Sequence, residues 1–120
     1  MFRRFPAGTR ARAIAAYDRP YDDPIAVDAG EAVTPGFARR TDILGWVWCT
    51  DSRGKSGWTP EAWIDRSVTP WRMFRAFNAI ELSVRPGDML RVHWSESGFV
   101  WATDSSGASG WVPDGVLQLD

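Results

Sequence analysis

Internal repetition is the feature of this sequence that most restricts its fold. The segment WVWCTDSRGKSGWTP (residues 46–60) aligns without a gap with FVWATDSSGASGWVP (residues 99–113), and ten of the fifteen positions are identical. A match of this length and identity within one chain indicates that a structural unit has been duplicated. We therefore expect two copies of one small fold.

Two shorter blocks upstream of this repeat match in the same order. Residues 25–33 (IAVDAGEAV) match residues 82–90 (LSVRPGDML), and residues 15–18 (AAYD) match residues 75–78 (RAFN). Only the stretches that connect the blocks differ in length. The similarity therefore covers nearly the whole chain from Ala13 onward.

Each copy has the pattern of short β-strands joined by tight turns. The stretch Trp46–Cys49 alternates large and small side chains, which is typical of a strand. Asp51–Gly54 and Asp104–Gly107 place glycine late in a turn, as β-hairpins do. Pro60 and Pro113 then end the returning strand and favour a single 3₁₀ turn. No segment shows the period of about 3.6 residues that marks an amphipathic helix, so the sequence predicts an all-β protein.

The charge of the chain disfavours binding to nucleic acid. The chain has 14 basic and 15 acidic residues. Residues 13–65 carry five basic against nine acidic residues, a net charge of −4, whereas a duplex-binding face needs clustered basic residues. Four arginines lie near the N-terminus, and we expect them to form a solvated basic tail: Arg3, Arg4, Arg10 and Arg12.

Cysteine content and hydropathy favour a cytoplasmic location. Cys49 is the single cysteine, which excludes an intramolecular disulfide and fits a reducing compartment. No apolar run approaches the roughly 18 residues that a membrane span requires. The first residues are basic, but no apolar stretch follows them as it would in a secretory signal. We therefore expect no membrane association.

The order of these blocks resembles that of the Src homology 3 (SH3) domain, in its bacterial tandem form. The A-L-Y-D-Y motif of that family is similar to Ala15–Asp18, and its E-L-S-F-x-x-G-D stretch is similar to Glu81–Asp88. Its W-W strand and its G-W-x-P ending correspond to Trp46-Val47 and to Gly57–Pro60. The resemblance implies two tandem SH3-like five-stranded β-barrels packed together. The implied domains are a basic N-terminal tail (1–12), a first barrel (13–66) and a second barrel (71–120).

The same resemblance implies a binding site on the first barrel. In the family, peptide ligands lie as polyproline II helices across a ridge of aromatic side chains, and acidic residues of the first long loop pair with a basic ligand residue. Carried over, this implies an exposed aromatic strip with acids at its edge. The candidate peptide-binding residues are Tyr17, Tyr21, Asp22, Asp23, Trp46, Pro60 and Trp63.

The second copy departs further from the family pattern. Phe77 and Phe99 lack the hydroxyl or indole N–H that hydrogen-bonds a ligand carbonyl, and Val116 replaces the last aromatic residue. We expect this copy to act mainly as a packing partner. Trp71 and Trp94 have no counterpart in the first copy and are candidates for an interface between the two barrels.

Residues suited to catalysis or metal binding are scarce. His93 is the single histidine, so a metal site there would have carboxylates as its other ligands. Cys49 aligns with Ala102, which indicates a small core position rather than a nucleophile. Asp22 and Asp23 are neighbours on a loop and show no acid–base geometry. We predict no enzymatic activity, no metal and no cofactor.

These observations predict a non-catalytic module that binds a peptide or protein partner, mainly through the first barrel. Two alternatives stay open. One is a structural or oligomerisation scaffold, such as a homo-oligomer. Its aromatic faces would be buried in its own assembly. The other is recognition of a cationic or nucleic-acid ligand by an aromatic cage. Exposure of Trp46 and Trp63 distinguishes the binding module from the scaffold.

Overall fold

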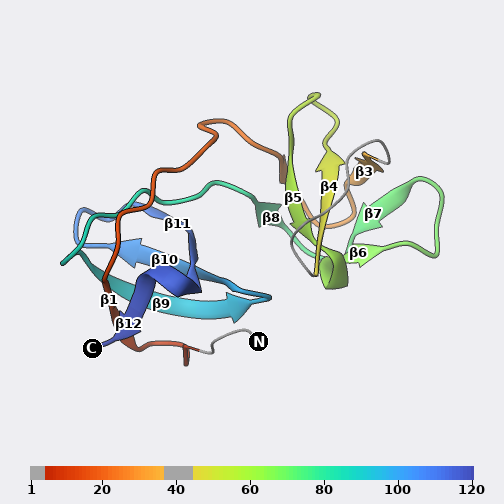
Figure 1. Ribbon diagram of the computed structural model, residues 1–120. Coiled ribbons are helices and arrows are strands. Elements are labelled where there is room, and N and C mark those ends of the chain that lie inside the picture. The colour runs from red at the N-terminus through yellow and green to blue at the C-terminus, as the bar shows by residue number, and fades with distance from the viewer. Residues whose placement is uncertain (1–4, 37–44) are drawn as a thin grey trace. The chain divides into compact units, whose positions relative to one another are not determined.

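The computed structural model describes residues 5–36 and 45–120. Its regular structure consists of strands and two 3₁₀ turns, so the predicted all-β class is confirmed. The chain divides into two compact units (Figure 1): unit 1 comprises Met1–Asp22 and Ile80–Asp120, and unit 2 comprises Asp23–Ala79.

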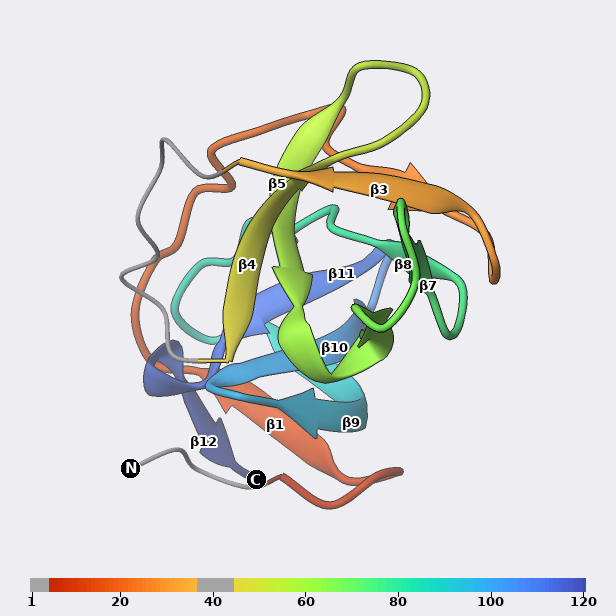
Figure 2. The same cartoon turned by 90° about the vertical axis from the view of Figure 1, so that its right-hand side faces the viewer.

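Unit 1 contains a five-stranded sheet with the order β11-β10-β9-β1-β12. All the pairings in this sheet are antiparallel, and Figure 2 shows β12 beside β1. The elements are β1 (Arg10–Ala13), β9 (Met89–Glu96), β10 (Phe99–Asp104), β11 (Ser109–Pro113), the 3₁₀ turn η2 (Asp114–Val116) and β12 (Leu117–Leu119).

Unit 2 repeats this arrangement with the order β5-β4-β3-β7-β6. A second, two-stranded sheet pairs β2 with β8. The elements are β2 (Ala26–Val27), β3 (Ala32–Pro35), β4 (Trp46–Thr50), β5 (Ser56–Pro60), η1 (Glu61–Trp63), β6 (Ile64–Asp65), β7 (Trp71–Met73) and β8 (Phe77–Asn78).

The hairpins follow the sequence prediction closely. Trp48 lies opposite Trp58, and Trp101 lies opposite Trp111, so the matched blocks form the same pairs. Gly54 and Gly107 adopt φ angles of 83° and 91°, a left-handed conformation that glycine reaches without steric cost. The 3₁₀ turns follow Pro60 and Pro113 as expected.

The two five-stranded sheets are open, so the prediction of closed barrels is wrong. The ends of the strand order are β5 and β6 in unit 2, and β11 and β12 in unit 1. In the part of the chain described, no pairing joins the two end strands of either sheet. The physical reason is local. Pro60 and Pro113 end β5 and β11, and the 3₁₀ turn directs the next residues to the opening strand, β7 or β1.

The two opening strands are exchanged between the copies. β1 precedes the first copy but pairs with β9 and β12 of the second, and β7 precedes the second copy but pairs with β3 and β6 of the first. The Ala13 amide donates to the Asp88 carbonyl at 2.8 Å, and the Met73 amide donates to the Glu31 carbonyl at 3.0 Å.

The units therefore differ from the predicted ranges 13–66 and 71–120. Their boundaries lie between Asp22 and Asp23 and between Ala79 and Ile80, within the loop that follows each opening block. In the predicted tail, Arg10 and Arg12 belong to β1, and residues 1–4 lie outside the described part of the chain.

The inward faces of the strands in unit 1 form an apolar core. Burial alternates along β1 and β10, as expected for strands with one face inward. The core residues are Phe5, Ala11, Ala13, Leu82, Val84, Leu90, Val92, Val100, Ala102, Val112 and Leu117.

Candidate functional site

The residues that were expected to form one aromatic strip belong to different units of the structure. Tyr17 belongs to unit 1, whereas Trp46, Pro60 and Trp63 belong to unit 2. The exchange of opening segments is the cause, because it places Phe77 in unit 2 at the position that aligns with Tyr17. The ring centroid of Phe77 lies 6.3 Å from that of Trp46 and 5.5 Å from that of Trp63.

The strip residues predicted for unit 2 are not exposed. Trp46 is 3% exposed, Trp63 is 8% exposed and Pro60 is fully buried, so the prediction that these three side chains form an exposed strip is wrong. Arg75 also covers Trp63, with its guanidinium carbon 4.0 Å from the ring centroid. A cation from the same chain thus occupies a face of Trp63.

The predicted loop acids pair with basic residues of the same chain. Asp22 accepts a hydrogen bond from Arg19 at 2.9 Å. Asp23 lies 3.3 Å from the Lys55 ammonium and 3.8 Å from the Arg53 guanidinium. Tyr21 is exposed on the same loop. Tyr21 and Asp22 belong to unit 1 together with Tyr17, whereas Asp23 belongs to unit 2 together with Trp46 and Trp63.

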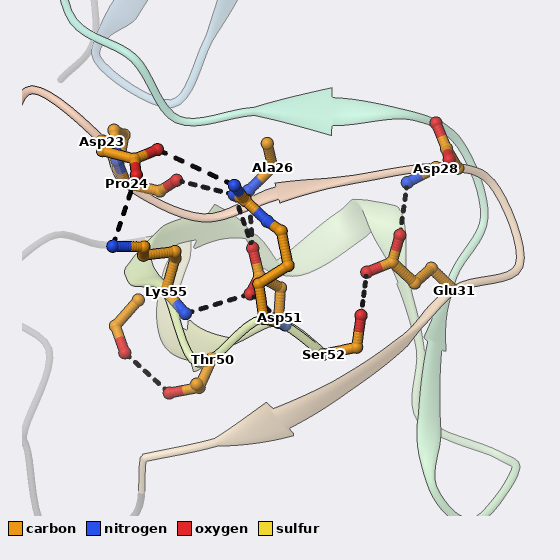
Figure 3. A network of polar contacts seen from close by, with 11 residues as sticks. Asp23, Pro24, Ala26, Asp28, Glu31, Thr50, Asp51, Ser52 and Lys55 are labelled. Atoms are coloured by element: carbon orange, nitrogen blue, oxygen red, sulfur yellow. Dashed lines mark hydrogen bonds and ion pairs between the residues drawn. The ribbon is translucent and has the colours of Figure 1, made fainter.

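A polar network fixes the β4–β5 hairpin of unit 2 (Figure 3). The buried Asp51 carboxylate accepts backbone N–H groups from Ala26, Arg53 and Lys55 at 2.9–3.1 Å, together with the Arg53 guanidinium at 3.0 Å. Burial opposes ionisation, but these donors outweigh it and hold the pKa of Asp51 below its ordinary value. The network is structural, and it ties β2 to the hairpin.

Unit 1 holds a carboxylate that sequence reasoning did not select as a site residue. The Tyr17 hydroxyl donates a hydrogen bond to Glu81. Burial raises the pKa of Glu81 above its ordinary value, although the bond from Tyr17 acts in the opposite direction. Burial and the neighbouring carboxylate also raise the pKa of Tyr17. Glu81 was visible in the sequence as the first residue of the ELSV block.

Three tryptophans pack together on the face of the unit 1 sheet opposite the core residues Val100 and Val112. Trp94 stacks on Trp101 with ring centroids 6.3 Å apart, and Trp101 meets Trp111 edge-on at 5.4 Å. Trp94 is 36% exposed and Trp111 is buried. The predicted role of Trp94 and Trp71 between the units stays a prediction. Within its own unit, Trp71 lies 5.9 Å below the Arg66 guanidinium.

The carboxylate and the tryptophan row are adjacent. Glu81 forms a parallel bridge with Trp111, since the Trp111 amide donates to the Ile80 carbonyl at 2.9 Å and the Leu82 amide donates to the Trp111 carbonyl at 2.9 Å. Pro113 lies two residues beyond Trp111 on the same strand face, opposite Phe99. We call Tyr17, Glu81, Phe99, Trp111 and Pro113 the unit 1 strip.

At the aligned position of the repeat, unit 2 has Pro24 in place of this carboxylate. Pro24 precedes the block 25–33 as Glu81 precedes the block 82–90. Among residues 5–36 and 45–120, no group of three or more histidine, cysteine, aspartate or glutamate side chains is arranged to hold a metal ion. No helix within these ranges is long and apolar enough to span a membrane.

Comparison with known proteins gives no independent indication of function. The sequence matches no protein-family model, and no curated protein matches it. The candidate site therefore rests on the geometry of unit 1.

Proposed function

We propose that this chain is a non-catalytic, SH3-like binding module that recognises a peptide or protein partner through the unit 1 strip. The observation that supports the proposal is the Tyr17–Glu81 pair beside Trp111. Four residues of the strip, Tyr17, Glu81, Phe99 and Pro113, are half-buried and keep some surface for a ligand, whereas Trp111 is buried like Trp46 of unit 2. Aromatic side chains are frequent anchors in protein interfaces because they bring large area at a modest entropy cost.

The chemistry of the strip favours an extended peptide that has one basic residue. Aromatic slots accept apolar ligand side chains, and a carboxylate at their edge pairs with an arginine or lysine. A ligand cation would stabilise the ionised form of Glu81 and lower the pKa that burial has raised. Binding should therefore weaken when acid protonates Glu81.

Unit 2 is less suited to the same role. Its aromatic residues Trp46 and Trp63 are buried against Phe77, and Arg75 lies over Trp63. Pro24 stands where a carboxylate would be needed. These features favour the scaffold role for unit 2, so the proposed module combines a binding unit with a structural one.

Selection from a displayed peptide library tests the proposal. The full chain is immobilised, peptides are selected at neutral pH, and the affinity of the selected peptides is measured by calorimetry for wild type, Glu81→Gln and Glu61→Gln. Glu61 pairs with Arg66 in unit 2, so its variant controls for loss of one negative charge.

We expect Glu81→Gln to weaken binding about fivefold, close to 1 kcal/mol for a partly exposed ion pair, and Glu61→Gln to leave binding unchanged. Failure to select any peptide, or equal affinities for the two variants, would reject the proposal. The scaffold interpretation would then apply to both units.

A further inference from the structure

Unit 1 depends on its opening segment. β1 lies between β9 and β12, and it provides the strand pairing recorded for β12 in the described sheet. Ala11 and Ala13 of β1 are buried within the apolar core. Removal of the segment would therefore open the core and leave the backbone groups of two strands without their partners.

The side chains of each opening strand have sizes that suit one of the two sheets better than the other. Ala11 lies opposite Leu90 in unit 1, and Trp71 lies opposite Val33 in unit 2. Leu90 and Val33 are aligned positions of the repeat, as are Ala11 and Trp71. Each pair thus joins one small and one large side chain. Transfer of β7 to unit 1 would place Trp71 against Leu90, which a close-packed core does not accommodate.

The segment connects to the rest of unit 1 only through the whole of unit 2. The chain leaves unit 1 after Asp22 and returns at Ile80. The loop that leads away contains Pro20 and Pro24, and it bends at residues 20, 22 and 23. The connecting residues 19–23 are exposed and lie outside the strands, so their path can change without loss of core packing, as exchange of the segment between molecules requires.

We propose that the chain forms segment-exchanged dimers, in which residues 5–18 of each copy complete unit 1 of the other. The contacts in unit 1 are the same whether the segment comes from the same chain or from a second copy. The two states differ mainly in the effective concentration of the segment within its own chain, which depends on the connection through unit 2. Tyr17 of one copy then hydrogen-bonds Glu81 of the other, so both copies contribute to each unit 1 strip.

Cross-strand disulfides report which chain supplies β1. Arg12 lies directly opposite Gln118, and both are exposed. Opposite residues in antiparallel strands have Cα atoms about 4.5–5.5 Å apart, within the range that a disulfide requires. Cysteine is introduced at positions 12 and 118 in a Cys49→Ala background, which removes the native thiol. Alanine is chosen because Ala102 occupies the aligned position in unit 1.

Two full-length chains, one with Arg12→Cys and one with Gln118→Cys, are unfolded together, refolded at high concentration and oxidised. We expect a covalent dimer of the two unlike chains on a non-reducing gel, more abundant than in a mixture oxidised without refolding. The matched control pairs Arg12→Cys with Asp65→Cys, since Asp65 aligns with Gln118 but lies opposite Arg72 in unit 2. This mixture should give little unlike dimer.

The double variant Arg12→Cys/Gln118→Cys verifies that β1 and β12 pair at all. A disulfide within that chain, together with no unlike dimer in the mixture, would overturn the proposal. Equal cross-linking to positions 118 and 65 would also overturn it, and so would failure of the double variant to cross-link. None of these outcomes depends on the peptide-binding role of the unit 1 strip.

Discussion

At the residue scale, the repeated glycines are among the most restricted positions in the chain. A Cβ atom built at Gly110 would lie 2.8 Å from the backbone carbon of Glu81 and 2.8 Å from the nitrogen of Leu82. At the aligned Gly57, a Cβ atom would lie 2.9 Å from a methyl group of Ile25. Both glycines allow the strand that enters the unit to cross close to the returning strand.

Gly110→Ala should therefore destabilise the protein by about 1–3 kcal/mol, the usual range for overpacking. Backbone atoms of Glu81 and Leu82 cannot move aside as a flexible side chain would. Urea unfolding measures the change, with Gly115→Ala as the control because no atom lies within 4 Å of its Cβ position. Equal stability of the two variants would contradict the close approach.

Asp51 predicts a specific pH dependence of stability. Its pKa is lowered in the folded state, so its contribution is present above the unfolded pKa of about 3.9 and is lost as the pH falls through the folded value. Asp51→Asn should cost about 2 kcal/mol near neutral pH, because an amide accepts fewer of the four donors. The stability difference between wild type and variant, measured by urea unfolding, should narrow from pH 5 to pH 2. A constant difference over that range would contradict this role.

At the element scale, the hairpins could be predicted from the sequence and the opening strands could not. Residues 46–60 and 99–113 contain alternation, turn glycines and a terminal proline, and each signal acts between residues near in sequence. The segments RARA and WRM of β1 and β7 are short and give no such signal. The matching motifs AAYD and RAFN fit either copy, so the repeat alone does not show where each segment docks.

Size matching between β1 and β9 is testable with a double-mutant cycle. Ala11→Leu should destabilise unit 1 by about 1–3 kcal/mol through overpacking, and Leu90→Ala by about 2–5 kcal/mol through the cavity it leaves. The double variant should recover part of both losses, since the two side chains lie opposite each other. Chemical denaturation measures the coupling energy, and additive losses would contradict direct contact.

The candidate site could be predicted only in part, because the sequence does not show which copy each opening strand joins. Tyr17 was selected from the sequence, and it does lie in the site proposed here. Its partners Trp46, Pro60 and Trp63 were assigned from the order of the repeat, whereas the exchange joins Tyr17 to Glu81 and Val84 of the second copy. The prediction followed the order of residues along the chain, whereas the residues of the site are brought together by the pairing of β1 with the second copy.

At the scale of the whole molecule, the two units differ in how the chain builds them. Unit 2 is one continuous stretch, Asp23–Ala79, whereas unit 1 needs Met1–Asp22 together with Ile80–Asp120. Removal of the N-terminal segment should therefore unfold residues 80–120, which are distant in sequence. It should leave residues 23–79, which follow the segment directly, folded.

Deletion of residues 1–18 should unfold unit 1 and preserve unit 2. The deletion removes Tyr17 and β1, the strand that pairs with β12, and the core loses Ala11 and Ala13. All five strands of the larger unit 2 sheet remain. Amide hydrogen exchange should show lost protection in β9–β12 and retained protection in β3–β7. A self-contained first copy would give the reverse result, with protection lost in β3–β6, because its own opening strand would be missing.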